Sequence, residues 1–143
     1  SGFIDLDSKD CISQKYLDKL IKKRIIEYWG FSTKMHETLA KSDIVVLPSY
    51  REGLPKVLCE AAACAKPIIT TDVPGCRDAI IDGETGILVP KKDHKALIKA
   101  IELLISKPEY AINLGISGRN FAESKFDINN IVKTHMDLYH KCE

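Results

Sequence analysis

Two glutamates, Glu52 and Glu60, stand eight residues apart in the segment LPSYREGLPKVLCEAAACAKPIITTDVPG, residues 47–75. An apolar run, IVVLP, comes before Glu52, and Gly53 and Pro55 come just after it. The run predicts a buried strand, and a proline in this place is typical of a first helical turn. Glu52 therefore lies in a strand-to-helix loop, and Glu60 lies roughly 8–10 Å along the helix that follows.

The start of that helix has the chemistry of an anion site. Its first turn leaves backbone N–H groups unpaired and carries about half a positive charge, a combination that usually binds phosphate. Gly53 has no side chain to block close approach. An acid at Glu60 accepts hydrogen bonds from hydroxyls, as ribose-binding carboxylates do, and Glu52 accepts from a second set. The spacing fits a nucleotide-sugar, with a diphosphate in the middle and a sugar at each end.

The same residues also allow an ordinary interpretation. A glutamate before a helix is a common partner of the helix dipole, worth ~0.3–1 kcal/mol, and exposed acids on helices are common. An acid inside the otherwise apolar VLCEAAACA is harder to explain in this way, because such a residue is rarely buried without a partner. From spacing alone, both interpretations stay open.

We call the loop with Glu52 and the start of the helix that follows it the corner. The apolar pattern predicts the elements that hold this corner. Asp93 and Asp127 are expected to cap the last helices, and Gly115 and Gly118 to break the segment 108–126 into one or two short helices. Turns are expected at DVPGC and DGETG. The strands are expected at 24–30, 44–48 (buried on both faces), 67–71 and 86–90, and the helices at 14–23, 34–43, 55–65, 94–105, 108–126 and 128–142. This alternation predicts an α/β fold, a Rossmann-like open parallel sheet with helices on both faces.

Composition excludes several classes of protein. The 143 residues suit one domain, 1–143, and a net charge of +1 without a block of like charge is unlike a nucleic-acid-binding domain. No apolar run approaches the ~20 residues of a membrane span. Five cysteines, an odd number with no C-x-x-C, indicate free thiols in a reducing compartment, which makes the cytoplasm the default location.

The segment SYREGLPKVLCEA resembles the E-x7-E signature of retaining glycosyltransferases with the GT-B fold, of the group 1 or family 4 type. The similarity runs from about Trp29 to Phe126 and includes, in order, the strand SDIVVLPS, the turn TTDVPG, the turn DGETG and the closing phenylalanine. The segments YREGLPKVLCEA and TDVPGCRD are most similar to those of enzymes that build bacterial capsules, lipopolysaccharides and other surface polysaccharides.

This resemblance implies a hexosyltransferase-type enzyme that transfers a sugar from a UDP- or GDP-sugar with retention of configuration. The chain would be its C-terminal, donor-binding domain. Glu52 matches the acid that meets the transferred sugar and is the candidate catalytic residue, whereas Glu60 matches the acid that binds ribose. Lys56 is a further candidate for the phosphate, although a first-turn lysine more often points to solvent. The substrate-binding residues are then Gly53, Leu54, Pro55, Lys56 and Glu60, with Phe31 and Ser32 lining the nucleobase.

The family pattern also has parts that this sequence does not show. The basic pair that neutralises the leaving diphosphate and the N-terminal domain that binds a glycan or lipid-linked acceptor are both missing. We therefore expect the chain alone to be inactive and to bind donor weakly. The whole enzyme is expected in the cytoplasm or peripherally at the inner face of the membrane. No cofactor and no metal are expected, and the D-x-D at Asp5–Asp7 is interpreted as part of a turn.

Two other classes of protein compete with this interpretation. A nucleotide-sugar epimerase or NAD-dependent oxidoreductase could use a related sheet, but the G-x-G-x-x-G turn of such enzymes is absent from the sequence. A non-catalytic nucleotide-sugar-binding domain is the other alternative. Loss of either Glu52 or Glu60 would favour it, and both are present.

Overall fold

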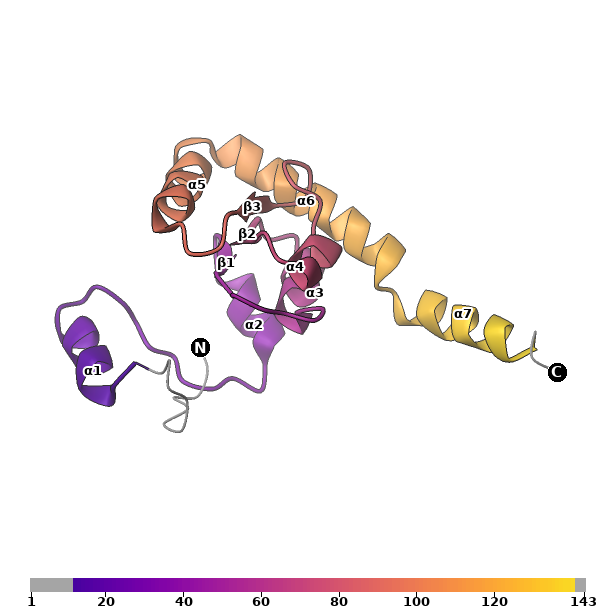
Figure 1. Ribbon diagram of the computed structural model, residues 1–143, viewed down its shortest axis with the longest axis horizontal. Coiled ribbons are helices and arrows are strands. Elements are labelled where there is room, and N and C mark those ends of the chain that lie inside the picture. The colour runs from indigo at the N-terminus through magenta and orange to yellow at the C-terminus, as the bar shows by residue number, and fades with distance from the viewer. Residues whose placement is uncertain (1–11, 141–143) are drawn as a thin grey trace. The chain divides into compact units, whose positions relative to one another are not determined.

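The computed structural model describes residues 12–140, and the chain falls into two compact units, Ser1–Met35 and His36–Glu143 (Figure 1). The described part of the first unit contains one helix, α1 (Gln14–Lys22). Ser13 caps it, since the Tyr16 N–H donates to the Ser13 Oγ at 3.3 Å. The predicted helix at 14–23 is confirmed.

Residues 24–30 were predicted to be a strand, and this prediction is wrong. They form no strand, and their large side chains are exposed, with Ile25 at 62% and Trp29 at 54%. A strand needs a neighbour that pairs its N–H and C=O groups. Within 12–35, the described part of the first unit, no second strand offers that pairing.

The second unit is built on three parallel strands in the order β1-β2-β3. They are β1 (Val45–Leu47), β2 (Ile68–Thr71) and β3 (Ile87–Val89). The helices are α2 (Met35–Ala40, which starts at the boundary of the units), α3 (Lys56–Ala63), α4 (Pro74–Ala79), α5 (His94–Ser106), α6 (Pro108–Lys125) and α7 (Ile128–His140). The predicted strands at 44–48, 67–71 and 86–90 are confirmed, as is the open parallel α/β sheet.

The side chains of β2 show how helices cover both faces of the sheet. Ile69 packs into a buried cluster with residues of α5 and α6, including Leu104 and Leu114. Thr70 points the other way, because side chains alternate along a strand. Its hydroxyl donates to the Leu47 carbonyl at 2.8 Å and lies 3.1 Å from the sulfur of Cys76 in α4. Figure 1 shows α5 and the α3–α4 pair on different sides of the strands.

Strand β1 differs from its prediction, because only one of its faces is well buried. Val45 is buried, but Val46 is 37% exposed. In the described sheet β1 is an edge strand that pairs with β2 alone. A strand buried on both faces needs more neighbours and more covering helices than β1 has in this unit.

Helix α6 runs unbroken through Gly115 and Gly118, which corrects the prediction of shorter helices. Both glycines are buried at contacts with other elements. A Cβ on Gly115 would overlap the carbonyl oxygen of Ala65, and a Cβ on Gly118 would lie 3.3 Å from the Thr85 oxygen. The two glycines allow α6 to pack closely against these elements. The contacts offset the ~1 kcal/mol that each glycine costs in helix propensity relative to alanine.

The carboxyl end of α3 is closed by the protein itself. Ala65 adopts a left-handed conformation, with a φ of 53°. Its N–H donates to the Ala62 carbonyl at 2.8 Å, and the Lys66 N–H donates to the Ala61 carbonyl at 3.0 Å, which together form a Schellman motif. The Arg119 Nη1 on α6 donates to the Ala63 carbonyl. This end of α3 therefore has its carbonyls satisfied and is fixed to α6.

Helices α5 and α7 carry their predicted caps. The Ala96 N–H donates to Asp93 Oδ1 at 2.9 Å, and the Asn129 N–H donates to Asp127 Oδ1 at 2.7 Å. No residue of α7 is buried. Among the helices of residues 12–140, none is both long and apolar enough to cross a bilayer.

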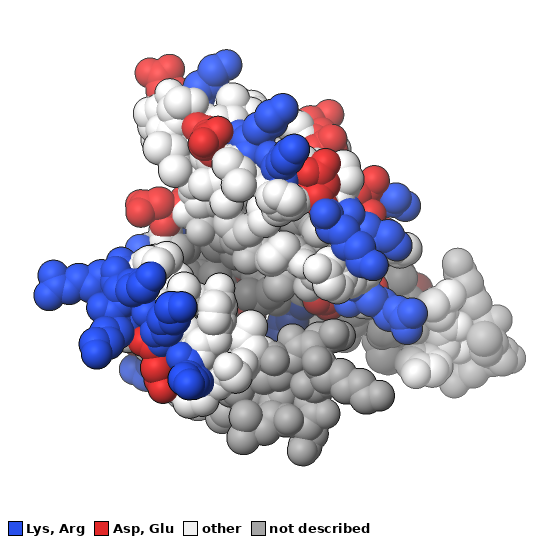
Figure 2. All heavy atoms as spheres, turned by 60° about the vertical axis from the view of Figure 1, so that its left-hand side comes forward, with Lys and Arg blue, Asp and Glu red and all other residues white. Residues whose placement is uncertain are grey.

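Figure 2 shows Lys and Arg side chains gathered in one cluster, whereas charges of both signs are interspersed over the rest of that face.

Candidate functional site

The loop between β1 and α3 holds the first glutamate in a defined position. The Ser49 Oγ donates to Glu52 Oε1 at 2.6 Å, and the side chain of Glu52 is half-buried. The loop is in turn attached to the end of β2, because the Thr71 hydroxyl donates to the Ser49 carbonyl. One carboxylate oxygen of Glu52 is therefore oriented by its own loop, and the loop by the sheet.

Gly75 fixes the same loop from another side. The predicted turn DVPGC is in part helical, since α4 begins at Pro74 and includes Gly75. A Cβ on Gly75 would overlap the Gly53 carbonyl oxygen and would lie 2.7 Å from the carbonyl oxygen of Glu52. The backbones of α4 and the loop thus touch. Sequence reasoning did not single out Gly75, although the Pro-Gly of TTDVPG was the available signal.

The amino end of α3 is open. An added Cβ on Gly53 would meet no atom within 4 Å, and Leu54 is 52% exposed. Pro55 is buried and occupies the cap position, but it provides no side-chain hydrogen bond. Ser, Thr, Asp or Asn usually supplies that bond at a cap. The Pro55 carbonyl accepts from the Leu58 N–H at 2.9 Å, but Pro55 has no side-chain acceptor for the N–H groups of Lys56 and Val57, which lie next to the free space beside Gly53.

Glu60 is the fifth of the eight residues of α3 and is partly shielded. Its side chain is 33% exposed, and Oε1 is 3.4 Å from the Nζ of Lys56, which is 88% exposed. The expectation that Lys56 points to solvent is confirmed. An exposed i,i+4 pair of this kind is worth ~0.3–0.5 kcal/mol, so a ligand can replace it at little cost.

A pocket of about 370 Å³ opens beside Glu60, between α3 and the carboxyl end of α6. It places the carboxylate at the wall of a space large enough for part of a ligand. Its lining residues are Lys56, Cys59, Glu60, Ala63, Arg119, Ala122, Glu123, Phe126 and Asp127.

Three other groups near the corner have plain structural roles. Arg77 Nε lies 2.5 Å from Asp72 Oδ1, and this hydrogen bond lowers the pKa of the exposed Asp72 carboxyl. Arg77 is thus salt-bridged to Asp72. Burial is the main cause that raises the pKa of the Cys59 thiol, so Cys59 stays protonated at neutral pH and is a poor nucleophile.

Phe31 and Ser32 belong to the first unit, whereas the corner belongs to the second. Phe31 is 58% exposed, and the Ser32 Oγ accepts from the Lys34 N–H at 3.2 Å. Their role at a nucleobase stays a prediction. Asp5 and Asp7 lie outside the described residues. Within 12–140, no three His, Cys, Asp or Glu side chains gather as a metal site requires.

Comparison with known proteins places this geometry in a family. The sequence profile of "Glycosyl transferases group 1" matches residues 3–121. An N,N'-diacetylbacillosaminyl-diphospho-undecaprenol alpha-1,3-N-acetylgalactosaminyltransferase of Campylobacter jejuni is 33% identical over 135 residues, covering 93% of this chain and 34% of that protein. The capsular polysaccharide biosynthesis glycosyltransferase CapM of Staphylococcus aureus is 38% identical over 97 residues, 68% of this chain and 26% of that protein.

A solved structure supports the fold. The crystal structure of Anabaena HepE in complex with UDP-glucose superposes with a TM-score of 0.84 and 21% identity, covering 98% of this chain and 39% of that one. HepE shares the GT-B architecture with this chain. The chain spans about a third of the length of the curated relatives that it matches, 34% and 26% in the two cases above.

Proposed function

Because the chain belongs to the group 1 family of glycosyltransferases, we propose that residues 1–143 are the donor-binding domain of a retaining hexosyltransferase. The observation that supports this most is the open amino end of α3. It has no side-chain cap and has free space beside Gly53, and along the chain Glu52 comes before it and Glu60 after it.

Each group at the corner has a part in the proposed reaction. Breaking the sugar–phosphate bond leaves negative charge on the diphosphate, and donors that are already oriented stabilise such developing charge. The backbone N–H groups of Gly53 and Leu54 in the loop and of Lys56 at the start of α3 provide those donors, and Pro55, which has no N–H, lines the same site through its other backbone atoms. Glu60 accepts hydrogen bonds from the ribose. Glu52, oriented by Ser49, meets the transferred sugar and stabilises positive character at its anomeric carbon.

The donor is a UDP- or GDP-sugar, and the acceptor is a glycan or a lipid-linked sugar. UDP-glucose in HepE supports the donor class, and the names of the Campylobacter and Staphylococcus relatives support the acceptor class and a role in bacterial surface polysaccharide. In this proposal the nucleotide-sugar is a substrate, and neither cofactor nor metal takes part. The enzyme works in the cytoplasm or at the inner face of the membrane.

In this proposal a second domain supplies the acceptor site, and the basic pair for the diphosphate belongs to the donor-binding domain itself. This part of the proposal follows from the chain's covering about a third of its relatives. The chain alone is then inactive, and it binds nucleotide with a Kd of about 1 mM, the range of weak sites.

Titration of the ¹⁵N-labelled chain with UDP, GDP and ADP, followed by NMR, tests the proposal. We expect shifts at the amides of Gly53–Glu60 with at least one nucleotide. Glu60→Ala should weaken binding by about tenfold, because the ribose loses its acceptor, a loss of ~1.4 kcal/mol. Glu52→Ala should leave UDP binding nearly unchanged and should reduce discrimination between UDP-sugars.

Glu102→Ala, an exposed acid on α5, is the matched control and should bind as the unsubstituted chain does. The proposal fails if no nucleotide shifts the 53–60 amides at about 10 mM, tenfold above the expected Kd. It also fails if Glu60→Ala and Glu102→Ala bind equally well.

A further inference from the structure

A second concave surface lies away from the corner, between the turn at residues 82–86 and one side of α6. We call it the α6 pocket. Its volume is about 540 Å³. It is lined by Ile81, Gly83, Glu84, Thr85, Tyr110, Asn113, Leu114, Ser117, Asn120 and Phe121.

The α6 pocket lies at the amino ends of the strands, and the corner lies at their carboxyl ends. The turn at 82–86 comes just before β3, and so at the amino ends of the strands. The loop with Glu52 follows β1, at the carboxyl ends. Because the three strands are parallel, their amino ends lie together at one end of the sheet and their carboxyl ends at the other. A ligand in the α6 pocket is therefore not part of the proposed donor site.

The floor of the α6 pocket offers neutral hydrogen-bonding groups in a row. Asn113, Ser117 and Asn120 are spaced at i, i+4 and i+7, which places them on one side of α6. All three are exposed. Amides and hydroxyls both donate and accept hydrogen bonds, which suits a ligand rich in hydroxyl groups. Of the described residues that line the pocket, Glu84 alone is charged, so the pocket does not suit a phosphate or a nucleotide.

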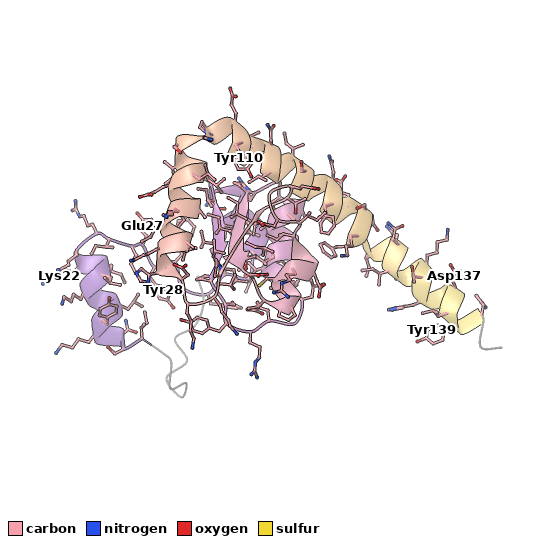
Figure 3. The ribbon with its side chains drawn as sticks, turned by 45° about the horizontal axis from the view of Figure 1, so that its top comes forward. Lys22, Glu27, Tyr28, Tyr110, Asp137 and Tyr139 are labelled. Carbon is pink, nitrogen blue, oxygen red and sulfur yellow. The ribbon has the colours of Figure 1, made fainter. Side chains whose placement is uncertain are left out.

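Two aromatic rings stand at the ends of this row. Tyr110 packs against the buried α5–α6 cluster, and its hydroxyl donates to the Gly83 carbonyl at 3.4 Å. Figure 3 shows Tyr110 at the amino-terminal part of α6. Phe121 makes an edge-to-face contact with Phe126, with 5.5 Å between the centroids, and Lys125 Nζ lies 5.1 Å from its ring. Both rings are half-buried and held in place before a ligand arrives.

The geometry points to a binding site for a neutral oligosaccharide. Phe121 lies eleven positions after Tyr110 on the helix, a rise of about 16 Å, which a short oligosaccharide spans. Aromatic rings pack against the C–H faces of sugar rings, and the amide and hydroxyl side chains between them bind sugar hydroxyls. Since no cation lines the pocket among the described residues, charge does not contribute to affinity. The site is independent of the donor proposal.

Maltotriose and chitotriose, two neutral trisaccharides, are the probes for this site. On titration into the ¹⁵N-labelled chain, at least one should shift the amides of 83–85 and 110–121, with a Kd of about 1 mM. The double variant Asn113→Ala/Asn120→Ala should weaken this binding by about tenfold. Alanine has a higher helix propensity than asparagine, so the variant is expected to fold.

The matched control is Asn129→Ala/Asn130→Ala on α7, which removes two exposed amides outside the pocket and should bind both sugars as before. Two outcomes would overturn the inference. One is that neither sugar shifts these amides at about 10 mM, and the other is that the pocket variant binds as tightly as the control. A parallel UDP titration reports on the 53–60 amides, so failure of one proposal is distinguishable from failure of the other.

Discussion

The two ends of α3 are built in contrasting ways. At the carboxyl end, Ala65 and Lys66 N–H groups and the Arg119 side chain donate to the last carbonyls of the helix. At the amino end, Pro55 provides no side-chain bond, and space is open beside Gly53. A glycine of another helix touches the chain close to each end, Gly115 at one and Gly75 at the other.

The contrast separates a structural contact from a candidate binding contact. Where the protein satisfies its own backbone groups, close packing contributes to stability. At the amino end the protein positions a loop just as closely but supplies no side-chain cap to the next turn, and in our proposal this packing orients the first-turn N–H groups for a ligand. Glycine has the same steric role in both places, and the missing side-chain cap is what marks the amino end as the proposed binding contact.

The largest expected effect on stability follows from disturbing the carboxyl end of α3. Gly115→Ala places a Cβ against the Ala65 carbonyl, and overpacking of this kind costs about 3 kcal/mol. The gain in helix propensity returns ~1 kcal/mol, so we expect a net loss of about 2 kcal/mol in the free energy of unfolding. Thermal denaturation should show a Tm lowered by about 6 °C.

Gly118→Ala is the matched control for Gly115→Ala. It lies one turn later on α6, and its Cβ would be 3.3 Å from the nearest atom, so the helix-propensity gain should offset the tighter contact. If both variants unfold at the same temperature, the contact of α6 with the end of α3 does not have the role assigned to it.

A smaller effect is expected from disturbing the open end. Gly75→Ala forces the backbone at Gly53 and Glu52 to move, but this loop is partly exposed and can shift without emptying the core. Nucleotide binding should therefore fall by about tenfold, or ~1.4 kcal/mol, with a smaller change in Tm than Gly115→Ala gives. Equilibrium titration and thermal denaturation of the same samples measure the two quantities.

Gly53→Ala distinguishes the two glycines of this contact. Its Cβ enters open space, so the Tm should stay unchanged while nucleotide binding weakens through loss of close approach. A lowered Tm for Gly53→Ala, or unchanged binding for Gly75→Ala, would contradict the division between packing and binding at this end.

The smallest effect concerns the Asp72–Arg77 pair at the rim of the open end. The hydrogen bond from Arg77 lowers the pKa of the Asp72 carboxyl below its usual range. The pair thus stabilises the folded chain at pH values above the usual pKa of an aspartate, and the contribution disappears as the pH falls through the lowered pKa. Urea unfolding of the parent chain and of Asp72→Asn should differ slightly at pH 7 and converge in strong acid. A difference that persists there would exclude this linkage.

Local sequence patterns predicted most of the strands and the helix caps. The strands at 44–48, 67–71 and 86–90 and the caps at Asp93 and Asp127 follow from neighbours along the chain, and the structure confirms them. The corner itself, with Gly53 and Pro55 after a strand, is also a local pattern. Its use as a donor site stays a prediction.

The remaining features depend on residues that are distant in sequence. The contact of Gly75 with Gly53 joins two segments whose separate patterns indicate only a turn and a loop. Gly115 and Gly118 appeared to be helix breakers because their packing partners, near Ala65 and Thr85, are far along the chain. The expected strand at 24–30 failed for the related reason that strand formation depends on a partner rather than on its own residues.

The edge position of β1 has a practical consequence for all of these measurements. In the second unit, the outer side of β1 presents backbone groups that no described strand pairs, next to the partly exposed Val46. Such an edge is a template for a strand of another molecule, so we expect concentration-dependent self-association to add to the observed shifts. Shifts caused by self-association grow with protein concentration at a fixed ligand ratio, whereas those caused by a bound nucleotide or sugar follow ligand occupancy. A dilution series separates the two.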